Sequence, residues 1–355
     1  MDEGGHGERR GGMAPSERHV TRRELLPSGC RVLTVGDGDF AFSEALALAR
    51  AADACAGAFV STSYDGEAET RERYAACASG RLERVRAAGA KVICGVDATR
   101  LGAPGCPLEG VAAFDRIVFN FPLLPVTAKR PLDGSGDMIL ANRAMLAEFL
   151  RRAACLLAPG GRVIIASKDL YPYSWWRIEA LPAWSGGQLE FLEMLPWELT
   201  EYPSLYRGPC NVNRDAAVKA TDAVLFIFGR SGELRAECGP VDPAFQWRLG
   251  GGNGLRLVTP AGPFRCEVCR LAGMSSEADL EAHRAGKIHR KRESLESRWE
   301  ANYRHIFAAA APVASKEAAG SGVVAGAVKQ LADAVGASLG PLCKRLCVAT
   351  RGDPA

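Results

Sequence analysis

Two cysteines and two histidines in the last third of the chain constrain its fold more than any other feature. They have the spacing C-x2-C-x13-H-x5-H, and only five histidines occur in the whole sequence. Two thiolates and two imidazoles form a closed tetrahedral shell, which is the usual ligand set of a structural zinc site. The sequence therefore predicts a small module that folds around Zn2+, with Cys266, Cys269, His283 and His289 as the ligands.

A basic run follows the last of these residues. Arg290, Lys291 and Arg292 come directly after His289, while the net charge of the whole chain is only +3. Affinity for nucleic acid would therefore depend on a local patch, and a metal-stabilised module with a cationic helix favours such contact. We expect the three basic side chains to form one array that docks on RNA.

The remaining composition is that of a soluble globular protein of about two domains, with 355 residues of which 24% are charged. No apolar run approaches the roughly 18–20 residues that cross a bilayer, so we expect no membrane contact, and the N-terminus lacks the apolar core of a secretory signal. The chain has twelve cysteines, and the ten outside the metal pair are scattered singly. We therefore expect a reducing compartment, and we interpret Cys343 and Cys347 as ordinary thiols.

Short apolar runs alternate with helical segments between residues 31 and 230. We expect helices at 40–50, 67–88 and 139–157, and strands at RVLTV, AFVSTSYD, KVICGVDAT, FDRIVFNFP, RVIIASK, LEFLEMLPWEL and AVLFIFGR. This alternation predicts parallel βαβ units, and hence an α/β sheet with helices on both faces.

Composition divides the chain into five parts. We expect a disordered tail at 1–27, the α/β domain at 28–232, a linker at 233–262, the C2H2 finger with its basic helix at 263–305, and an Ala- and Gly-rich segment that could form one helix at 306–355. A linker at this place predicts that the finger unfolds separately from the α/β domain.

A glycine-rich turn follows the first expected strand, at Gly36-Asp37-Gly38-Asp39-Phe40. Such a turn lets the backbone approach a cofactor at the carboxyl edge of the sheet, although a purely structural turn has the same pattern. The third glycine of the dinucleotide signature is absent. Because two carboxylates in the loop would repel a pyrophosphate and attract a cation, the loop favours S-adenosylmethionine over NAD.

Polar residues also end the next three expected strands. Asp65 is placed to accept hydrogen bonds from a ribose and Asp97 from an adenine amino group, with solvated strand-end aspartates as the alternative. The fourth strand ends in Phe119-Asn120-Phe121-Pro122, which resembles the (N/D)-P-P-(Y/F) element of nitrogen-directed methyltransferases. A rigid turn there would offer Asn120 to a planar nitrogen-bearing substrate, although a strand end capped by Pro122 is the simpler alternative.

Together these elements resemble a known family. The segment from about Arg31 to Arg230 is similar to the large-subunit rRNA (uridine-N3) methyltransferase-like domain in VLTVGDGDFAFS, GVDAT, FDRIVFNFP, RVIIASK, PYSWWRIEAL and YPSLYRG. The resemblance implies a class I Rossmann-like methyltransferase sheet with flanking helices and S-adenosyl-L-methionine as the cofactor. It implies cofactor contacts from Gly36, Gly38, Asp65 and Asp97, to which we add Asp37, Asp39, Phe40 and Asn120.

Two positions depart from the family pattern. Leu123 stands where the family usually has histidine, and Ala141-Asn142 stands where its helix often has Lys-His. These changes bear on the identity of the substrate more than on cofactor binding. The C-terminal module resembles U1-like, matrin-type C2H2 zinc fingers, which recur in RNA-binding proteins.

The α/β domain lacks the common neutral-pH base, because no histidine occurs between His19 and His283. The proton on uracil N3 could pass to Asp37, Asp39 or Asp169, or Lys168 could stabilise the uracil anion. We expect catalysis mainly by positioning. The expected catalytic residues are Asn120, Pro122, Asp39 and Lys168.

Aromatic residues follow the fifth expected strand, where a base could stack on one of them, or they could simply cover the sheet. They are Tyr171, Tyr173, Trp175 and Trp176, and the same two interpretations apply to Tyr202, Tyr206 and Arg207.

The sequence thus predicts an RNA methyltransferase that acts on N3 of a uridine in large-subunit rRNA. We expect a monomer in the nucleus or nucleolus, with the cytoplasm as the alternative. Two other functions stay open: a non-catalytic zinc-finger RNA-binding protein with a degenerate methyltransferase domain, and a methyltransferase for another RNA, such as tRNA, or for protein.

Overall fold

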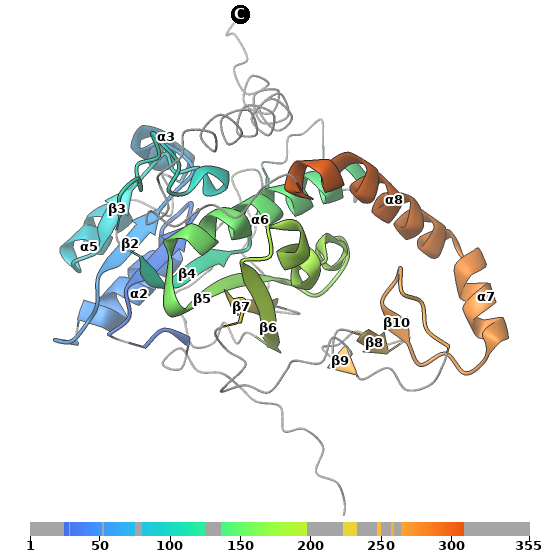
Figure 1. Cartoon of the computed structure of the whole chain (residues 1–355). Helices are drawn as coiled ribbons and strands as arrows, with labels where there is room; N and C mark the ends of the chain where they lie inside the picture. Colours follow the sequence, from blue (N-terminus) through green and yellow to red (C-terminus); the bar gives the residue numbers. More distant parts are fainter. Residues whose placement is uncertain are drawn as a thin grey trace, which may run out of the picture.

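A seven-stranded sheet between helices forms the main body of the computed structural model (Figure 1). The structure describes residues 25–27, 29–51, 53–74, 80–111, 113–124, 136–196, 223–232, 247–249, 257–258 and 264–308. Several predictions fall outside these residues, namely the N-terminal tail, Tyr202, Tyr206, Arg207, most of the linker, and the C-terminal segment with Cys343 and Cys347.

The strand order of the sheet is β3-β2-β1-β4-β5-β7-β6. Neighbours from β3 to β5 pair in parallel, and β7 is antiparallel to both β5 and β6. The strands are β1 Val32–Val35, β2 Phe59–Thr62, β3 Lys91–Ile93, β4 Phe114–Asn120, β5 Leu157–Lys168, β6 Leu189–Pro196 and β7 Ala223–Arg230. This is a class I Rossmann-like methyltransferase sheet, so the predicted fold class is confirmed. Strand order reverses between β1 and β4, which is where doubly wound sheets bind their ligands.

Helices cover both faces of the sheet. They are α2 Ala41–Ala51, α3 Glu67–Arg73, α5 Arg81–Ala87 and α6 Gly136–Leu156, with short 3-10 turns η1 Ala98–Arg100, η2 Tyr173–Trp176 and η3 Ile178–Trp184. The single helix predicted over 67–88 was wrong. Helix α3 ends at Tyr74, which leaves helical geometry at φ −115° and ψ 25°, and α5 starts after Gly80, whose φ of 73° is left-handed.

The two cores follow the alternation of side chains along each strand. In β4, Ile117 and Phe119 face the core under α6, whereas Val118 faces the core under α2 and α5. In β5, Ile164 shares the side of Val118. The carboxyl ends of β1, β4 and β5 are thereby held rigidly side by side, and the loops that leave them share one edge.

The C-terminal module comprises a three-stranded sheet and two helices. Its sheet has the order β10-β8-β9, with β8 Trp247–Leu249, β9 Leu257–Val258 and β10 Leu271–Ala272, and its helices are α7 Glu277–Ala285 and α8 Lys287–Ala308. The linker expected at 233–262 therefore contains two strands that pair within the module. Within the described part of the chain, none of the helices combines the length and apolarity of a bilayer crossing.

Helix α8 is packed against the α/β domain and is not separated from it. Leu295 and Trp299 are buried in the core under α6, with exposed fractions of 3% and 1%. Leu295, Trp299 and Tyr303 recur every four residues, so one stripe of α8 is apolar and requires a partner surface. The expected separation by a linker does not extend to α8, because α8 shares the core of the α/β domain. Figure 1 shows α8 lying beside α6, with α7 and the small sheet farther from the main sheet.

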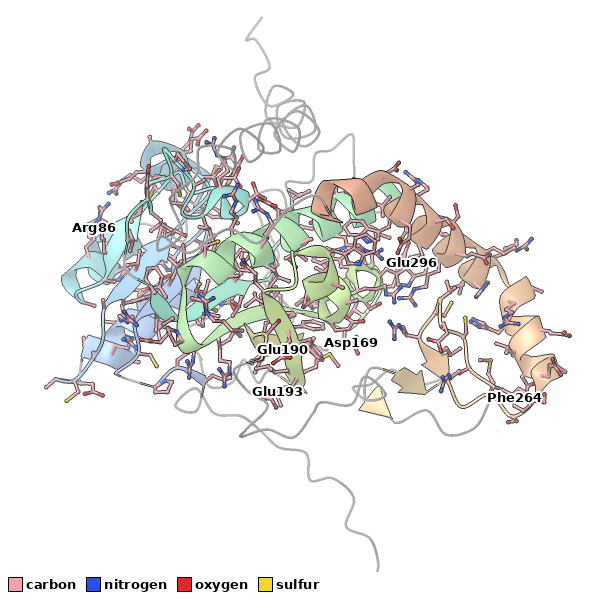
Figure 2. The ribbon with its side chains drawn as sticks, in the orientation of Figure 1. Arg86, Asp169, Glu190, Glu193, Phe264 and Glu296 are labelled. Carbon is pink, nitrogen blue, oxygen red and sulfur yellow. The ribbon has the colours of Figure 1, made fainter. Side chains whose placement is uncertain are left out.

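An ion pair accompanies this apolar contact. Arg143 of α6 is 2% exposed, and both of its terminal nitrogens donate to Glu296 of α8 at 2.9 Å. Its guanidinium also lies 5.1 Å from the ring centroid of Trp299. Glu296 is seen where α8 meets the rest of the body in Figure 2. Because a buried cation without its partner costs several kcal/mol, this pair fixes α8 on α6.

Candidate functional site

The glycines of the loop after β1 are required by the protein's own aromatic side chains. Gly36 has a φ of 64°, and a Cβ there would lie 2.8 Å from Cε2 of Phe119. A Cβ on Gly38 would lie 2.5 Å from the hydroxyl oxygen of Tyr74. The loop is thus pressed against β4 on one side and against the end of α3 on the other. Tyr74 was not singled out from the sequence, since nothing in its neighbourhood marks it as part of a site.

Asp37 has a carboxyl group that titrates near neutral pH. Its Oδ2 accepts hydrogen bonds from the backbone N–H of Ser43 at 2.7 Å and from the Ser43 hydroxyl at 2.6 Å. Burial, and next the charge of Asp39, raise the pKa of Asp37 to about 7 despite these bonds. The raised pKa of Asp37 suits a proton acceptor near neutral pH, and a bound cation would favour its charged form.

Asp39 already has partners within the protein. Its Oδ1 accepts from the N–H of Ala41 at 3.1 Å, and its Oδ2 lies 2.8 Å from Nη1 of Arg81. The residue is 5% exposed. Asp39 thus holds the start of α2 and ties it to α5, while its charge acts on Asp37. Phe40, which follows it, is fully buried at a φ of 58°.

The two further acids lie in loops just beyond their strands. Asp65 comes three residues after the end of β2, is 8% exposed, and pairs with Arg73 at 3.1 Å. Asp97 caps η1, because its Oδ1 accepts from the N–H and hydroxyl of Thr99 at 2.8 and 2.7 Å. The N–H of Gly95 donates to the backbone carbonyl of Asp65 at 3.0 Å, so the two loops are joined.

The turn after β4 presents an unsatisfied acceptor. Among the described residues, no hydrogen-bond partner reaches the buried Oδ1 of Asn120. The turn itself is rigid, because Phe121 has a φ of 47° and donates its N–H to the carbonyl of Ala166 at 2.8 Å, and Pro122 is buried. Such an orphaned oxygen in a fixed turn is typical of a position that a ligand fills.

Asn142 secures the same turn from α6. Its Oδ1 accepts from the N–H of Leu124 at 2.9 Å, and its Nδ2 donates to the carbonyl of Met138 at 2.8 Å. The side chain is fully buried. The sequence indicated Asn142 only as a departure from the family pattern, whereas its contacts make it a support of the turn that carries Asn120.

The residues at this edge fit S-adenosylmethionine better than a phosphate-bearing cofactor. The loops after β1, β2 and β3 carry carboxylates, and the turn after β4 carries a neutral acceptor. Arg73 and Arg81 are the cations beside them, and each is paired with an acid. A cationic ligand would relieve the repulsion between Asp37 and Asp39, whereas a diphosphate would add to it.

Beyond β5, the aromatic residues divide into two kinds. Trp175 and Trp176 are 7% and 1% exposed and belong to the core, so they cover the sheet. Tyr171 is 44% exposed and stands edge-on to Trp175 with ring centroids 5.0 Å apart. Tyr171 is thus the most accessible of the four predicted stacking residues, and Lys168 and Asp169 lie half-buried just before it.

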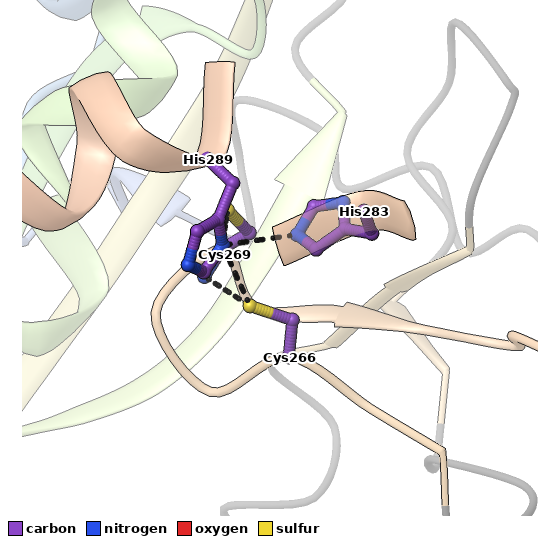
Figure 3. Close-up of side chains that lie close together, drawn as sticks. All are labelled: Cys266, Cys269, His283 and His289. Atoms are coloured by element: carbon purple, nitrogen blue, oxygen red, sulfur yellow. Dashed lines mark hydrogen bonds between the residues drawn. The ribbon is translucent and has the colours of Figure 1, made fainter. Parts of the chain in front are cut away.

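The four predicted metal ligands converge on one point (Figure 3). Their ligand atoms lie within 4.8 Å of one another, and Nδ1 of His289 is 3.3 Å from Sγ of Cys266, 3.5 Å from Sγ of Cys269 and 3.3 Å from Nε2 of His283. A tetrahedron with Zn–N of about 2.0 Å and Zn–S of about 2.3 Å has edges of roughly 3.3–3.8 Å. The geometry therefore fits a zinc ion.

The charge state of the Cys269 thiol depends on a cation. Burial, and next the neighbouring sulfur of Cys266, raise the pKa of Cys269 to about 11 in the absence of metal. Burial and His289 lower the pKa of His283. The neutral His283 imidazole is ready to coordinate, whereas the Cys269 thiol loses its proton when a cation binds, so metal binding should release a proton.

The basic run after His289 does not form one array. Arg290 and Lys291 are exposed, whereas Arg292 points inward and donates to the carbonyl of Cys269 at 3.1 Å. Nζ of Lys291 lies 3.3 Å from the hydroxyl of Tyr171. A helix distributes consecutive residues around its axis, so three successive cations cannot all face one ligand. The expectation of a single array was wrong for Arg292.

Comparisons with known proteins identify a family for this chain. A family model described as BMT5-like rRNA (uridine-N3-)-methyltransferase matches residues 33–207. An uncharacterized protein of Arabidopsis thaliana is 30% identical over 176 residues, which are 49% of this chain and 78% of that protein. Heavy metal-associated isoprenylated plant protein 41 of Arabidopsis thaliana is 30% identical over 178 residues, so 50% of this chain spans only 32% of that relative. TrmN from Thermus thermophilus, a solved structure, has a TM-score of 0.33 at 16% identity, with 57% of this chain and 44% of that chain covered. The chain belongs to the BMT5-like rRNA (uridine-N3-)-methyltransferase family.

Proposed function

We propose that this chain is an S-adenosylmethionine-dependent RNA methyltransferase that methylates N3 of a uridine in large-subunit rRNA. The observation that carries the proposal is the carboxyl edge of the sheet between β1 and β4. There the acidic loop with Asp37 and Asp39 adjoins the turn that holds the unsatisfied Oδ1 of Asn120. A cationic cofactor fits the acidic loop, and a planar nitrogen-bearing substrate fits the turn with Asn120. Family membership supports the same chemistry.

The proposed role of the chain's own residues is to position the base and accept one proton. When bound, the cofactor supplies an electrophilic methyl group. Asn120 and Pro122 would hold the uracil ring so that N3 is in line with that group. The proton on N3 would pass to Asp37, whose pKa of about 7 suits a proton acceptor, while Lys168 would stabilise negative charge on the ring.

Mass spectrometry of modified nucleosides tests the reaction and the substrate together. Large-subunit rRNA and tRNA would be isolated from cells with and without the protein, and 3-methyluridine quantified in each. Loss from rRNA supports the proposal, loss from tRNA alone assigns another RNA, and no loss from either contradicts methylation of uridine N3. Calorimetry with S-adenosylmethionine separates a degenerate domain, which would give no binding heat, from an active one.

The partner, metal and location belong to the same proposal. The exposed Arg290 and Lys291 favour RNA as the partner of the C-terminal module, and the four-ligand cluster favours one Zn2+ per chain. A uridine in pre-ribosomal RNA would place the protein in the nucleus or nucleolus, and we propose a monomer. Metal analysis of the purified protein, its sedimentation behaviour and imaging of a tagged chain test these three points.

A further inference from the structure

Arg292 joins the metal cluster to the chain that leaves β5. One terminal nitrogen donates to the backbone carbonyl of Cys269, which is a predicted metal ligand, at 3.1 Å. The other lies 3.5 Å from the backbone carbonyl of Ser174 in η2, and the guanidinium carbon lies 5.2 Å from the ring centroid of Trp175. A single planar side chain thus spans from the cysteine turn to the segment that follows the catalytic edge.

The segment that receives this contact is confined between two helices. Trp175 is 7% exposed, and its carbonyl accepts a 2.6 Å hydrogen bond from Nη2 of Arg143 on α6. Tyr171, at the start of the segment, contacts Lys291 of α8 through its hydroxyl. Only two residues separate Lys168, the last residue of β5, from Tyr171, so the position of the segment is closely linked to that of the strand end. The contacts of Arg292 and Lys291 make the position of Ser174 and Tyr171 depend in part on where the first turns of α8 lie.

The far half of α8 has its own anchors. Glu296 is held by Arg143 and by Arg177, the latter at 3.0 Å, and Trp299 is buried in the core beside Trp184 with ring centroids 5.3 Å apart. These contacts do not involve the metal ligands. Loss of metal should therefore release the first turns of α8 and leave its second half packed on α6.

We infer that Arg292 is a positioning residue through which the metal-bound finger sets the conformation of residues 171–177 beside the methyl-transfer edge. This role rests on the proposed function and deepens it: the finger would be part of the structure that shapes the RNA-binding edge, and not a docking module on a linker. A metal ion fixes the cysteine turn, the turn fixes Arg292, and Arg292 fixes Ser174 and Trp175. Methyl transfer to a short oligonucleotide is then as dependent on zinc as transfer to long structured RNA.

Hydrogen–deuterium exchange of the full chain, followed by mass spectrometry of its peptides, tests the coupling without any need for turnover. Chelation of zinc from the wild type should speed exchange in residues 171–177 on the order of tenfold, together with 264–292, and added zinc should restore both. Peptides covering 295–303 should change little. If 171–177 keeps its protection while 264–292 loses it, the coupling does not exist.

Three variants locate the coupling at one side chain. With one zinc still bound per chain, Arg292→Ala should speed exchange at 171–177 on the order of tenfold. Arg292→Lys should do nearly the same, because an ammonium group cannot reach both carbonyls at once. Arg290→Ala removes the same charge from an exposed position on the same helix and should change nothing in that segment. Equal protection in Arg292→Ala and wild type would overturn the inference.

Activity measurements separate this inference from the proposed function. On a short uridine-bearing oligonucleotide, Arg292→Ala should lower kcat more than it raises KM. The substitution shifts residues 171–177 beside the methyl-transfer edge and removes no exposed contact with RNA. If methyl transfer is never detected while the exchange pattern is as expected, the proposed function fails and the coupling stands. If Arg292→Ala does not fold, chelation of zinc from the wild type still tests the coupling, because it uses the unaltered chain.

Discussion

Replacing Asp37 by asparagine should make the stability of the protein less dependent on pH. The pKa of this carboxyl is raised from 3.8 to about 7, first by burial and then by Asp39. In the unfolded chain it returns to an ordinary value of about 3.9. Between these values the folded state holds a proton that the unfolded state has lost. The stability linked to Asp37 is thus complete below pH about 4 and is lost as the pH rises through about 7.

The size of the effect follows from the shift. A rise of about three pKa units corresponds to about 4 kcal/mol at pH about 8, since one unit is 1.36 kcal/mol. Asp37 retains some exposure and shares its repulsion with Asp39, so we expect about half of this value. Asparagine keeps an oxygen that accepts from Ser43 and carries no charge. Asp37→Asn should therefore be more stable than the wild type by about 2 kcal/mol at pH about 8, by about 0.7 kcal/mol at pH about 5, and nearly equal to it at pH about 4.

Urea denaturation followed by tryptophan fluorescence, at several values between pH about 5 and about 8, measures this difference. Asp115→Asn is the matched control, because the hydrogen bond from Arg31 lowers the pKa of Asp115. The stability that Asp115 contributes is lost only as the pH falls below about 4, so its variant should differ from wild type by a constant amount in this range. A constant difference for Asp37→Asn as well would refute the reasoning.

Three further substitutions test separate contacts. Gly38→Ala should lower the free energy of unfolding by about 1–3 kcal/mol in denaturation, because its Cβ would lie 2.5 Å from the Tyr74 hydroxyl oxygen. Adding Tyr74→Phe should recover part of the lost stability, and a fully stable Gly38→Ala variant would contradict this contact. Asp65→Ala should weaken S-adenosylmethionine binding by about 1.5–3 kcal/mol in calorimetry while the domain stays folded, and unchanged affinity would exclude a role in cofactor binding. Trp299→Ala should cost about 3–5 kcal/mol and lower the melting temperature of the α/β domain itself, so an unchanged main transition would show that α8 is not part of its core.

The sheet and the metal ligands could be predicted because their signals are local. Each strand is a short apolar run, and all seven expected strands are present in the class I order. The spacing of Cys266, Cys269, His283 and His289 determined a cluster that the structure brings within 4.8 Å. In both cases, residue type and spacing along the chain carry enough information to specify the neighbours in space.

The contacts between distant segments could not be predicted in the same way. Helix α8 is rich in Lys, Arg and Glu, so its composition indicated a solvated helix, and the four-residue recurrence of Leu295, Trp299 and Tyr303 was the signal that was missed. The division of the basic run depends on the rotation of α8 about its axis, which is fixed by Trp299 and not by the run itself. Likewise, the partners of Asp39 and Asp65 are arginines of α5 and α3, and Arg81 lies 42 residues from Asp39 along the chain.

The buried Arg143 couples two parts of the chain that are far apart in sequence. Its guanidinium is nearly inaccessible and is neutralised by Glu296, which lies 153 residues away in the finger helix. The same side chain donates to the backbone carbonyl of Trp175, so one cation is shared by α6, η2 and α8. Removal of the Glu296 carboxylate alone would leave this charge buried without its counter-ion, so a substitution in the finger helix would destabilise the core of the α/β domain.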